Sequence, residues 1–287
     1  MKIVADPASN LSPQRNAELN IEVVPFHIKL MGKTYRDGID ITPEALYRIY
    51  IQHPHEYSTT SQPSVGDFVS AYEKFSDEEI LSVHLSSGLS GTYSSAVGAA
   101  NIISPDQITV FDSKLIGPGL GWMVEVAAHG AKSGWSKKRI INALVRIREN
   151  SLTMATFLEM RYLIHSGRVS HLKGVLASVL KIKPIIGIDI ESGEFIELGK
   201  EMTMGRAARK MAKFVHRRFG KQKLHIQLLH GSNLRGVEML REALQKFTNC
   251  VEGRLVTVTP ALGAHSGPTV FGMAAIPSAL LSSLLEG

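Results

Sequence analysis

Hydroxyl side chains gather in a short loop between a predicted strand and a predicted helix. Ser86, Ser87 and Ser90 alternate there with Gly88 and Gly91, and glycines at such positions allow a tight turn. Hydroxyl groups and the positive end of a helix dipole both favour an anion. The alternative is an ordinary polar turn in which a serine caps the helix. The loop therefore suggests a carboxylate or phosphate site but does not establish one.

A second hydroxyl-rich stretch runs from residue 58 to 64 and contains Thr60 and Ser61. Ser64 and Asp67 have the spacing of a helix-capping arrangement, for a helix that continues to Phe75. A polar loop that ends in a helix cap is again the alternative to a ligand site. Two hydroxyl-rich helix starts in one domain favour the ligand site.

Two isolated basic residues could complete such a site. His265 lies in the glycine-rich stretch 261–268, and Arg168 follows Gly167 in a predicted turn. A histidine between small residues can donate to an anion, or it can be a turn histidine without a role. An arginine beside a turn is most often a surface residue. Together with the hydroxyls, the two side chains could hold an anion through charge-assisted hydrogen bonds.

Catalytic and cofactor motifs are incomplete. Residues 88–91 fall one place short of the Gly-x-Ser-x-Gly elbow of hydrolases, and nothing in the sequence sets a triad of Ser90, His265 and an acid. Residues 117–121 lack the spacing of a dinucleotide site, and no P-loop is present, so we do not expect intrinsic kinase activity. Cys250 is the only cysteine, and no histidines have metal-ligand spacing. We expect neither metal nor cofactor.

The composition is that of a folded globular protein. The chain has 287 residues, of which 44% are hydrophobic and 20% charged, and this length suits two domains. A single cysteine suits a reducing compartment. Asp6 and Pro7 come too early for a signal peptide, and charged residues, Gly or Pro interrupt the later apolar stretches. These features predict a cytoplasmic protein without a membrane span.

The formal net charge is +6 and the pI about 9.3, which could indicate a nucleic-acid partner. The basic residues gather in stretches 137–139 and 206–223, and neither zinc-ligand spacing nor an RNA-binding aromatic motif accompanies them. A solvated helix face is the default explanation. An acidic protein partner or transient contact with a membrane surface is the alternative, whereas nucleic acid is not expected.

Hydrophobic periodicity predicts two kinds of architecture along the chain. Up to about residue 150, strands alternate with helices, which is typical of a parallel sheet with helices on both faces; the strands fall at 2–5, 21–24, 79–85 and 107–111, and the helices at 65–75, 92–101, 118–132 and 137–150. Beyond it, a hairpin at 182–198 and further strands at 224–229, 255–259 and 270–276 accompany helices at 203 onward and 234–247. This second pattern indicates an α+β domain with a mixed or antiparallel sheet. We therefore expect an α/β fold with domains at 1–155 and 156–287.

Five motifs, in this order, resemble those of the DegV family. They are Thr60-Ser61-Gln62-Pro63-Ser64, Ser86-Ser87-Gly88-Leu89-Ser90-Gly91-Thr92-Tyr93, Ser166-Gly167-Arg168-Val169-Ser170, Lys183-Pro184-Ile185-Ile186 and Gly263-Ala264-His265-Ser266-Gly267-Pro268. The first two motifs together are specific for the family, whereas each of the others would be weak evidence on its own. The resemblance extends along nearly the whole chain.

The resemblance implies a two-domain protein that binds one long-chain fatty acid between its domains, in an apolar tunnel. Several family members serve as the fatty-acid-binding subunit of bacterial fatty acid kinase and present the acyl carboxylate to a separate, ATP-dependent kinase subunit. Carried over by motif, Thr60, Ser61, Ser90 and His265 would hold the carboxylate with support from Arg168. Further supporting residues could be Ser86, Ser87, Gly91, Ser266 and Gly267.

We therefore expect a lipid carrier that is not itself an enzyme. Burial of a C16 chain removes about 15 methylenes from water, worth roughly 12 kcal/mol before ordering costs. An alternative is a serine-dependent esterase or acyltransferase that uses Ser90 and His265, and another is a binder of a phosphorylated small molecule. The basic stretch 206–223 is our candidate for docking an acidic kinase surface.

Overall fold

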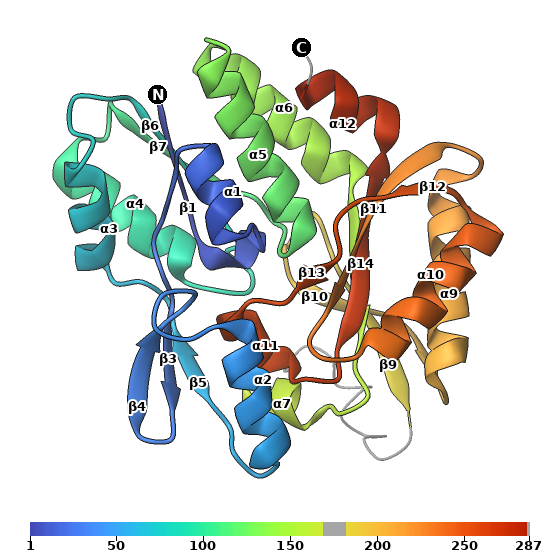
Figure 1. Ribbon diagram of the computed structural model, residues 1–287. Helices are drawn as coiled ribbons and strands as arrows, with labels where there is room; N and C mark the ends of the chain where they lie inside the picture. Colours follow the sequence, from blue (N-terminus) through green and yellow to red (C-terminus); the bar gives the residue numbers. More distant parts are fainter. Residues whose placement is uncertain (169–181, 286–287) are drawn as a thin grey trace.

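The computed structural model describes residues 1–168 and 182–285 (Figure 1). Its strands form three sheets. The first has the order β2–β1–β6–β7 and the small one β4–β3–β5, while the largest runs β10–β9–β8–β14–β11–β12 with β13 beside β11.

The first sheet is parallel throughout. Its strands are β1 (Lys2–Ala5), β2 (Ile21–Val23), β6 (Ile80–His84) and β7 (Ile108–Asp112). In the centre, Val4 pairs with Glu22 of β2 and Ser82 of β6. Every residue of β1 and β6 is buried, as expected for strands covered by helices on both faces. The parallel sheet predicted from the sequence is confirmed.

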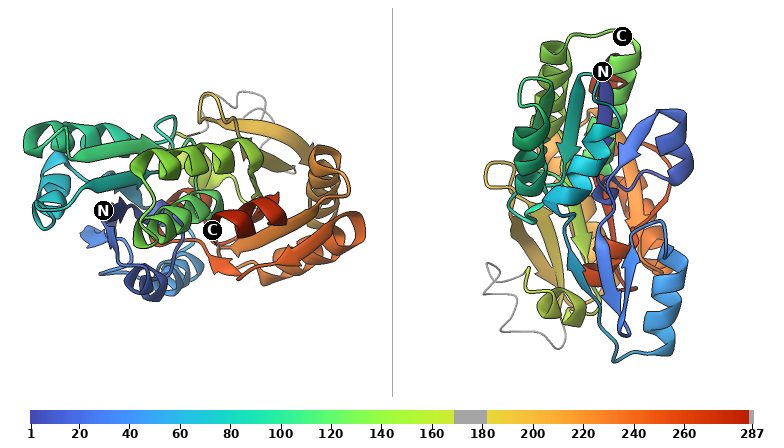
Figure 2. Two further views of the ribbon diagram at one scale, coloured as in Figure 1. Left: turned by 90° about the horizontal axis from the view of Figure 1, so that it is seen from above. Right: turned by 90° about the vertical axis from the view of Figure 1, so that its left-hand side faces the viewer.

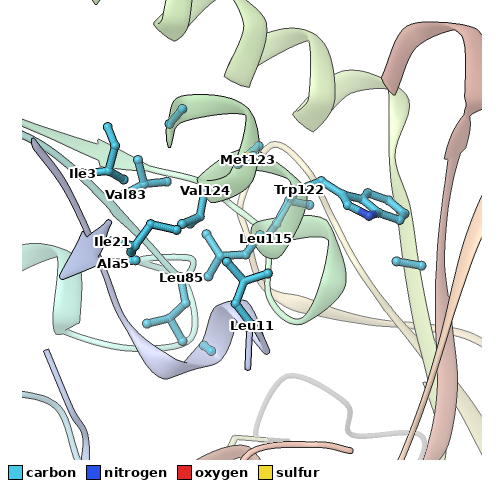
Figure 3. Packing of buried hydrophobic residues seen from close by; sticks show 14 of the residues in the cluster. Ile3, Ala5, Leu11, Ile21, Val83, Leu85, Leu115, Trp122, Met123 and Val124 are labelled. Atoms are coloured by element: carbon cyan, nitrogen blue, oxygen red, sulfur yellow. The ribbon is translucent and has the colours of Figure 1, made fainter. Parts of the chain in front are cut away.

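Helices cover both faces of this sheet. On one face, α3 (Val65–Glu73) and α4 (Thr92–Ile103) pack on Val4. On the other, α5 (Pro118–Lys132) places Met123 and Val124 over Ile3 and Val83 (Figure 3). Ser64 and Asp67 form the expected capping box of α3, and Ser136 caps α6 (Lys137–Asn150) as predicted.

The small sheet is antiparallel and stands below the first sheet in Figure 1. It consists of β3 (His27–Leu30), β4 (Lys33–Arg36) and β5 (Thr59–Ser61). Before it come the short helices η1 (Pro7–Ser9) and α1 (Pro13–Glu18), and α2 (Pro43–Gln52) follows β4.

The largest sheet is mixed, as predicted. Its strands are β8 (Leu152–Thr156), β9 (Lys183–Ile188), β10 (Phe195–Glu201), β11 (Lys223–His230), β12 (Asn249–Glu252), β13 (Val256–Thr257) and β14 (Phe271–Pro277). Strands β12 and β13 run parallel to β11, whereas the other pairs are antiparallel. The α/β class with a parallel and a mixed sheet is therefore confirmed.

Helices pack on the largest sheet, and some of them also connect it to the first sheet. Its helices α9 (Met204–Phe219) and α10 (Leu234–Phe247) pack on each other and on the sheet, while α5, α6 and the last helix α12 (Ser278–Leu285) contact β14. Seen from above, α5, α6 and α12 lie between the N-terminal strands at one end and α9 and α10 at the other (Figure 2). The predicted domain division after residue 155 falls inside β8 and stays a prediction.

Two short helices beside the motif residues were not predicted from the sequence. The glycine-rich stretch around His265 is a helix, α11 (Pro260–Ser266), because Pro260 opens it and Gly267 ends it with a φ of 70°. A five-residue helix, α7 (Arg161–His165), precedes Arg168. Within the described residues, no helix combines the length and the apolar character needed to cross a membrane.

Candidate functional site

A narrow cavity lies where loops of the first and small sheets meet the largest sheet. Its space, including the open mouth, is about 1050 Å³, of which about 140 Å³ is open to the centre of a water molecule. Because little of this space admits the centre of a water molecule, the cavity is narrow and suits a slender ligand. All five residues predicted to hold an anion line this cavity, namely Thr60, Ser61, Ser90, Arg168 and His265.

Thr60 and His265 meet across two elements that lie far apart in the sequence. Thr60 is on β5, where it pairs with Ile28 of β3, and α11 packs against both strands. The Thr60 Oγ1 lies 2.7 Å from His265 Nε2. This contact places a hydroxyl and an imidazole side by side at the polar end of the cavity.

The environment of His265 keeps its ring neutral. Burial, together with the nearby charge of Arg168, lowers the pKa of His265 to about 3. Its Nδ1 is buried and has no hydrogen-bond partner among the described residues. A neutral imidazole carries one N–H, so only one of its two nitrogens can donate.

Ser90 comes immediately before α4. Its Oγ lies 2.8 Å from Thr92 Oγ1 and also accepts a hydrogen bond from the Thr92 backbone N–H. Its own N–H donates to the Ser86 carbonyl, which fixes the turn. Ser90 therefore stands at the positive end of a twelve-residue helix, where negative charge is favoured.

Arg168 is exposed where the cavity opens. Its Nη1 donates to the Ser166 carbonyl at 2.5 Å, and partial burial lowers the pKa of its guanidinium. Among the described residues that line the cavity, Arg168 is the only charged one. The remainder of its motif, Val169 and Ser170, lies outside the described residues.

The proposed supporting residues have different positions. Ser266 lines the cavity, whereas Ser86 and Ser87 do not. Ser86 Oγ donates to the Gly193 carbonyl at 2.7 Å, and Ser87 Oγ donates to Asp112 at 2.5 Å. These bonds join the loop to the turn between β9 and β10 and to the end of β7, so both serines shape the site rather than line it.

The two supporting glycines allow close packing next to the cavity. A side chain at Gly91 would collide with Gln62, which itself lines the cavity. A side chain at Gly267 would collide with the ring of Tyr162. Gln62 belongs to the first motif, but its place in the site was not predicted.

The rest of the cavity wall is apolar. The largest sheet and the segments beside it contribute Phe157, Ile186, Leu229, Val258 and Val270, which form one hydrophobic cluster. The sequence predicted strands for most of these segments but did not show that one side of the cluster faces a cavity. The cavity thus combines a polar end with a long apolar wall.

The cavity geometry does not match a serine hydrolase. Ser90 and His265 contact Thr92 and Thr60, respectively, rather than each other, and no Asp or Glu is among the described lining residues. An acid is needed to orient the histidine of a triad. The esterase alternative therefore lacks both of the contacts that it requires.

A serine, a histidine and an aspartate do make the contacts of a triad elsewhere. His84 lies 2.9 Å from Asp6 through Nδ1 and 2.6 Å from Ser82 Oγ through Nε2, and Tyr72 donates to the same serine. The side chains of Asp6 and His84 are 0% exposed, so no substrate can reach them. Asp6 also accepts from the Leu85 N–H, which anchors the start of the loop that carries Ser90.

The described part of the chain contains no candidate metal site built from protein side chains. No three His, Cys, Asp or Glu side chains come together there in a way that could hold a metal ion.

Comparison with known proteins places this architecture in one family. The DegV family model matches residues 1–278. A DegV domain-containing protein of Staphylococcus aureus (strain COL) is 32% identical over 274 residues, which cover 94% of this chain and 96% of that protein. The chain belongs to the DegV family.

Solved structures of two family members have the same fold. One, described as fatty acid binding of a DegV family protein from Thermus thermophilus, is 26% identical with a TM-score of 0.87 and covers 96% of this chain and 99% of that one. A DegV lipid-binding protein of Thermotoga maritima is 25% identical with a TM-score of 0.83, over 96% and 97% of the two chains.

Proposed function

We propose that the protein is a carrier that holds one long-chain fatty acid in the cavity. The observation that carries this proposal is the distribution of polarity: one end offers hydroxyls, an imidazole and Arg168, whereas the wall beyond them is apolar. A fatty acid has the same distribution. The relatives described as fatty-acid-binding or lipid-binding support the proposal.

Thr60, Ser61, Ser90 and His265 hold the carboxylate in this proposal, and Arg168 supplies the positive charge. A buried carboxylate is costly unless it is hydrogen-bonded. If His265 carries its proton on Nε2, the ring donates to Thr60 Oγ1 and the threonine hydroxyl is free to donate to the carboxylate. In the other tautomer, the buried N–H at Nδ1 has no partner, and the Thr60 hydroxyl donates to His265 Nε2 and so cannot donate to the carboxylate. The first tautomer is therefore favoured.

The apolar wall binds the acyl chain. Each methylene that leaves water contributes about 0.8 kcal/mol, so affinity rises with chain length until the wall is filled. A phosphorylated metabolite would leave this wall unused, which disfavours the small-anion alternative. The narrow cross-section suits an unbranched chain.

The polar end lies at the mouth, since Ser61, Gln62 and Arg168 are exposed. A carboxylate held there is within reach of another protein. We include in the proposal that a separate ATP-dependent kinase phosphorylates it. Helix α9 is the candidate docking surface, because it has no acidic residue and exposes Arg206, Arg209 and Lys213.

Native mass spectrometry of the delipidated protein after addition of palmitate tests the carrier. We expect one bound molecule per chain. Thr60→Val removes a hydroxyl but keeps the shape, so it should weaken binding roughly 10- to 150-fold, the value of a hydrogen bond to a charged group. Thr59→Val is the matched control, because Thr59 is exposed on the same strand and does not line the cavity. A parent protein that rejects palmitate refutes the proposal.

The kinase step needs its own assay. With a candidate kinase and ATP, acyl phosphate should form only when the carrier is present. Replacement of Arg206 and Arg209 by glutamate should weaken docking, whereas the same change at Lys137 and Lys138 on α6 should not. Weakening by the α6 changes alone assigns docking to another face.

A further inference from the structure

The loop that carries Ser90 is held from both sides by aspartates outside the cavity. Strand β6, which leads into the loop, lies between β1 and β7. Asp6 follows β1, and Asp112 ends β7. Asp6 Oδ2 accepts the Leu85 N–H at 3.0 Å, and Asp112 Oδ1 accepts the Ser87 N–H at 3.1 Å. Neither aspartate lines the cavity, so each can act on a ligand only through the loop.

Asp112 gathers four contacts on its carboxylate. Its Oδ1 also accepts the Lys114 N–H at 3.1 Å, while its Oδ2 accepts the Ser87 hydroxyl at 2.5 Å and lies 3.1 Å from Lys114 Nζ. Burial alone would raise the pKa of Asp112, but the hydrogen bonds from Ser87 and Lys114 lower this pKa below its ordinary value. The carboxylate is therefore ionised at neutral pH, and hydrogen bonds to an ionised acceptor are the strong ones.

Lys114 extends this contact to the wall of the cavity. Its backbone lies in the left-handed region with a φ of 57°, which is uncommon for a residue other than glycine. Its Nζ donates to the Ser87 hydroxyl at 3.1 Å and to the Ser192 carbonyl, in the turn between β9 and β10, at 3.3 Å. The two strands joined by that turn contribute three side chains to the wall, Ile186, Ile188 and Phe195. The pair of Asp112 and Lys114 thus joins the loop to the apolar wall.

One peptide plane connects Asp112 to Ser90. The Ser87 N–H, which Asp112 accepts, and the Ser86 carbonyl belong to the same planar group. This carbonyl in turn accepts the N–H groups of Leu89 and Ser90, at 3.0 and 3.2 Å. Asp112 therefore sets the orientation of the plane, and the plane sets the position of the Ser90 backbone.

We propose that Asp112 is a positioning residue of the carboxylate site. It orients the peptide plane between Ser86 and Ser87 and thereby fixes Ser90 in the cavity wall, without contacting the ligand. This inference rests on the proposed function, because it takes Ser90 as a ligand of the fatty acid carboxylate. The restraint on the loop is a property of the protein without ligand and can be measured there.

Amide hydrogen exchange in the delipidated protein, followed by NMR, tests the restraint. Asp112→Ala removes all four contacts of the carboxylate, and exchange at the Leu89 and Ser90 amides should become roughly 10- to 150-fold faster, the value of a hydrogen bond to a charged group. The acceptor of these two amides, the Ser86 carbonyl, is unchanged by the substitution. Asp112→Asn keeps one oxygen and should have a smaller effect in the same direction.

The end of β7 has support that does not depend on the carboxylate. The Arg148 guanidinium donates to the backbone carbonyls of Asp112 and Ser113, so Asp112→Ala should fold. Asp106→Ala is the matched control, because Asp106 is exposed near the start of the same strand, and it should leave exchange in the loop unchanged.

Two exchange results overturn the proposal. Acceleration at Val83 of β6 without acceleration at Leu89 and Ser90 means that Asp112 supports the sheet rather than the loop. Equal acceleration in the loop by Asp106→Ala means that the effect is not specific to the Asp112 carboxylate.

A double-mutant cycle with palmitate links the restraint to the site. Asp112→Ala should weaken palmitate binding in the parent but have no further effect in Ser90→Ala, because the group that it positions is then absent. In Thr60→Val the effect should persist, since Thr60 lies on β5. If the losses in affinity from Asp112→Ala and Ser90→Ala simply add, the positioning role is overturned. A parent that rejects palmitate refutes the proposed function alone, and the exchange measurement still decides whether Asp112 holds the loop.

Discussion

Replacement of Asp37 by asparagine should stabilise the protein, and by more as the pH rises. Burial raises the pKa of Asp37 from its ordinary 3.8 to about 7. The folded protein therefore holds this proton up to about pH 7, whereas the unfolded chain releases it near pH 4. Because the folded state binds more protons between these values, the free energy of unfolding falls as the pH rises through this window.

The size of the effect follows from the same two values. Each pH unit in the window costs about 1.36 kcal/mol, so the cost accumulated between pH 5 and pH 7 is roughly 3 kcal/mol and stays constant above it. The amide that replaces the carboxyl group is neutral at every pH and can still accept from the Ala261 N–H. The stability advantage of Asp37→Asn over the parent should thus grow by roughly 3 kcal/mol from pH 5 to pH 8.

Urea unfolding of the delipidated protein, followed by circular dichroism at several pH values, measures this growth. Asp40→Asn is the control. The pKa of Asp40 is about 2, held low by the hydrogen bonds from Arg36, so the effect of this variant should be the same at pH 5 and pH 8. An advantage of Asp37→Asn that does not change between these pH values would refute the reasoning.

Three further predictions concern the loop and the site. Ser82→Ala leaves two buried hydrogen-bond partners unpaired and should cost roughly 2–4 kcal/mol in urea unfolding; the exposed Ser94→Ala should cost little, and equal effects would contradict the role of the network. Gly88→Ala puts a Cβ within 2.8 Å of the backbone at Gly193 and should cost about 1–3 kcal/mol. Gly66→Ala, whose Cβ would meet nothing closer than 3.6 Å, should leave the free energy of unfolding unchanged. If Gly88→Ala also leaves it unchanged, the turn between β9 and β10 does not pack closely against the loop at Gly88. Palmitate affinity should stay constant from about pH 6 to 8, because His265 remains neutral there; a step near pH 6.5 in a fluorescence titration means that the ring titrates.

Local sequence signals predicted the first sheet and its helices well. The run from residue 79 to 85, the glycine turn and the small residues after Thr92 became β6, a loop and α4, because short-range packing and turn geometry dominate there. The DegV motifs also pointed to residues that the fold brings to one cavity: Thr60, Ser90 and His265 all line it, and Thr60 contacts His265 although β5 and α11 lie about two hundred positions apart. Their role in binding stays a prediction.

Features that depend on tertiary contact could not be predicted in the same way. The apolar wall comes from strands whose buried residues look alike in sequence, whether they face a core or a cavity. Asp37 and His84 are buried only because distant segments cover them. Helix α11 is different: Pro260 and Gly267 are a recognisable start and stop, and the signal was available, although the glycines inside the segment favoured a turn.

The most direct test of the fatty acid proposal is the carbon NMR signal of palmitate labelled at its carboxyl carbon. In complex with the protein, this carboxyl should give one resolved signal whose titration midpoint lies below that of palmitate in vesicles, because hydroxyls and Arg168 stabilise its charged form. Thr60→Val should move the signal, whereas Thr59→Val should not. A carboxyl signal that titrates as in vesicles, and that neither substitution moves, would contradict the assignment of the head-group site.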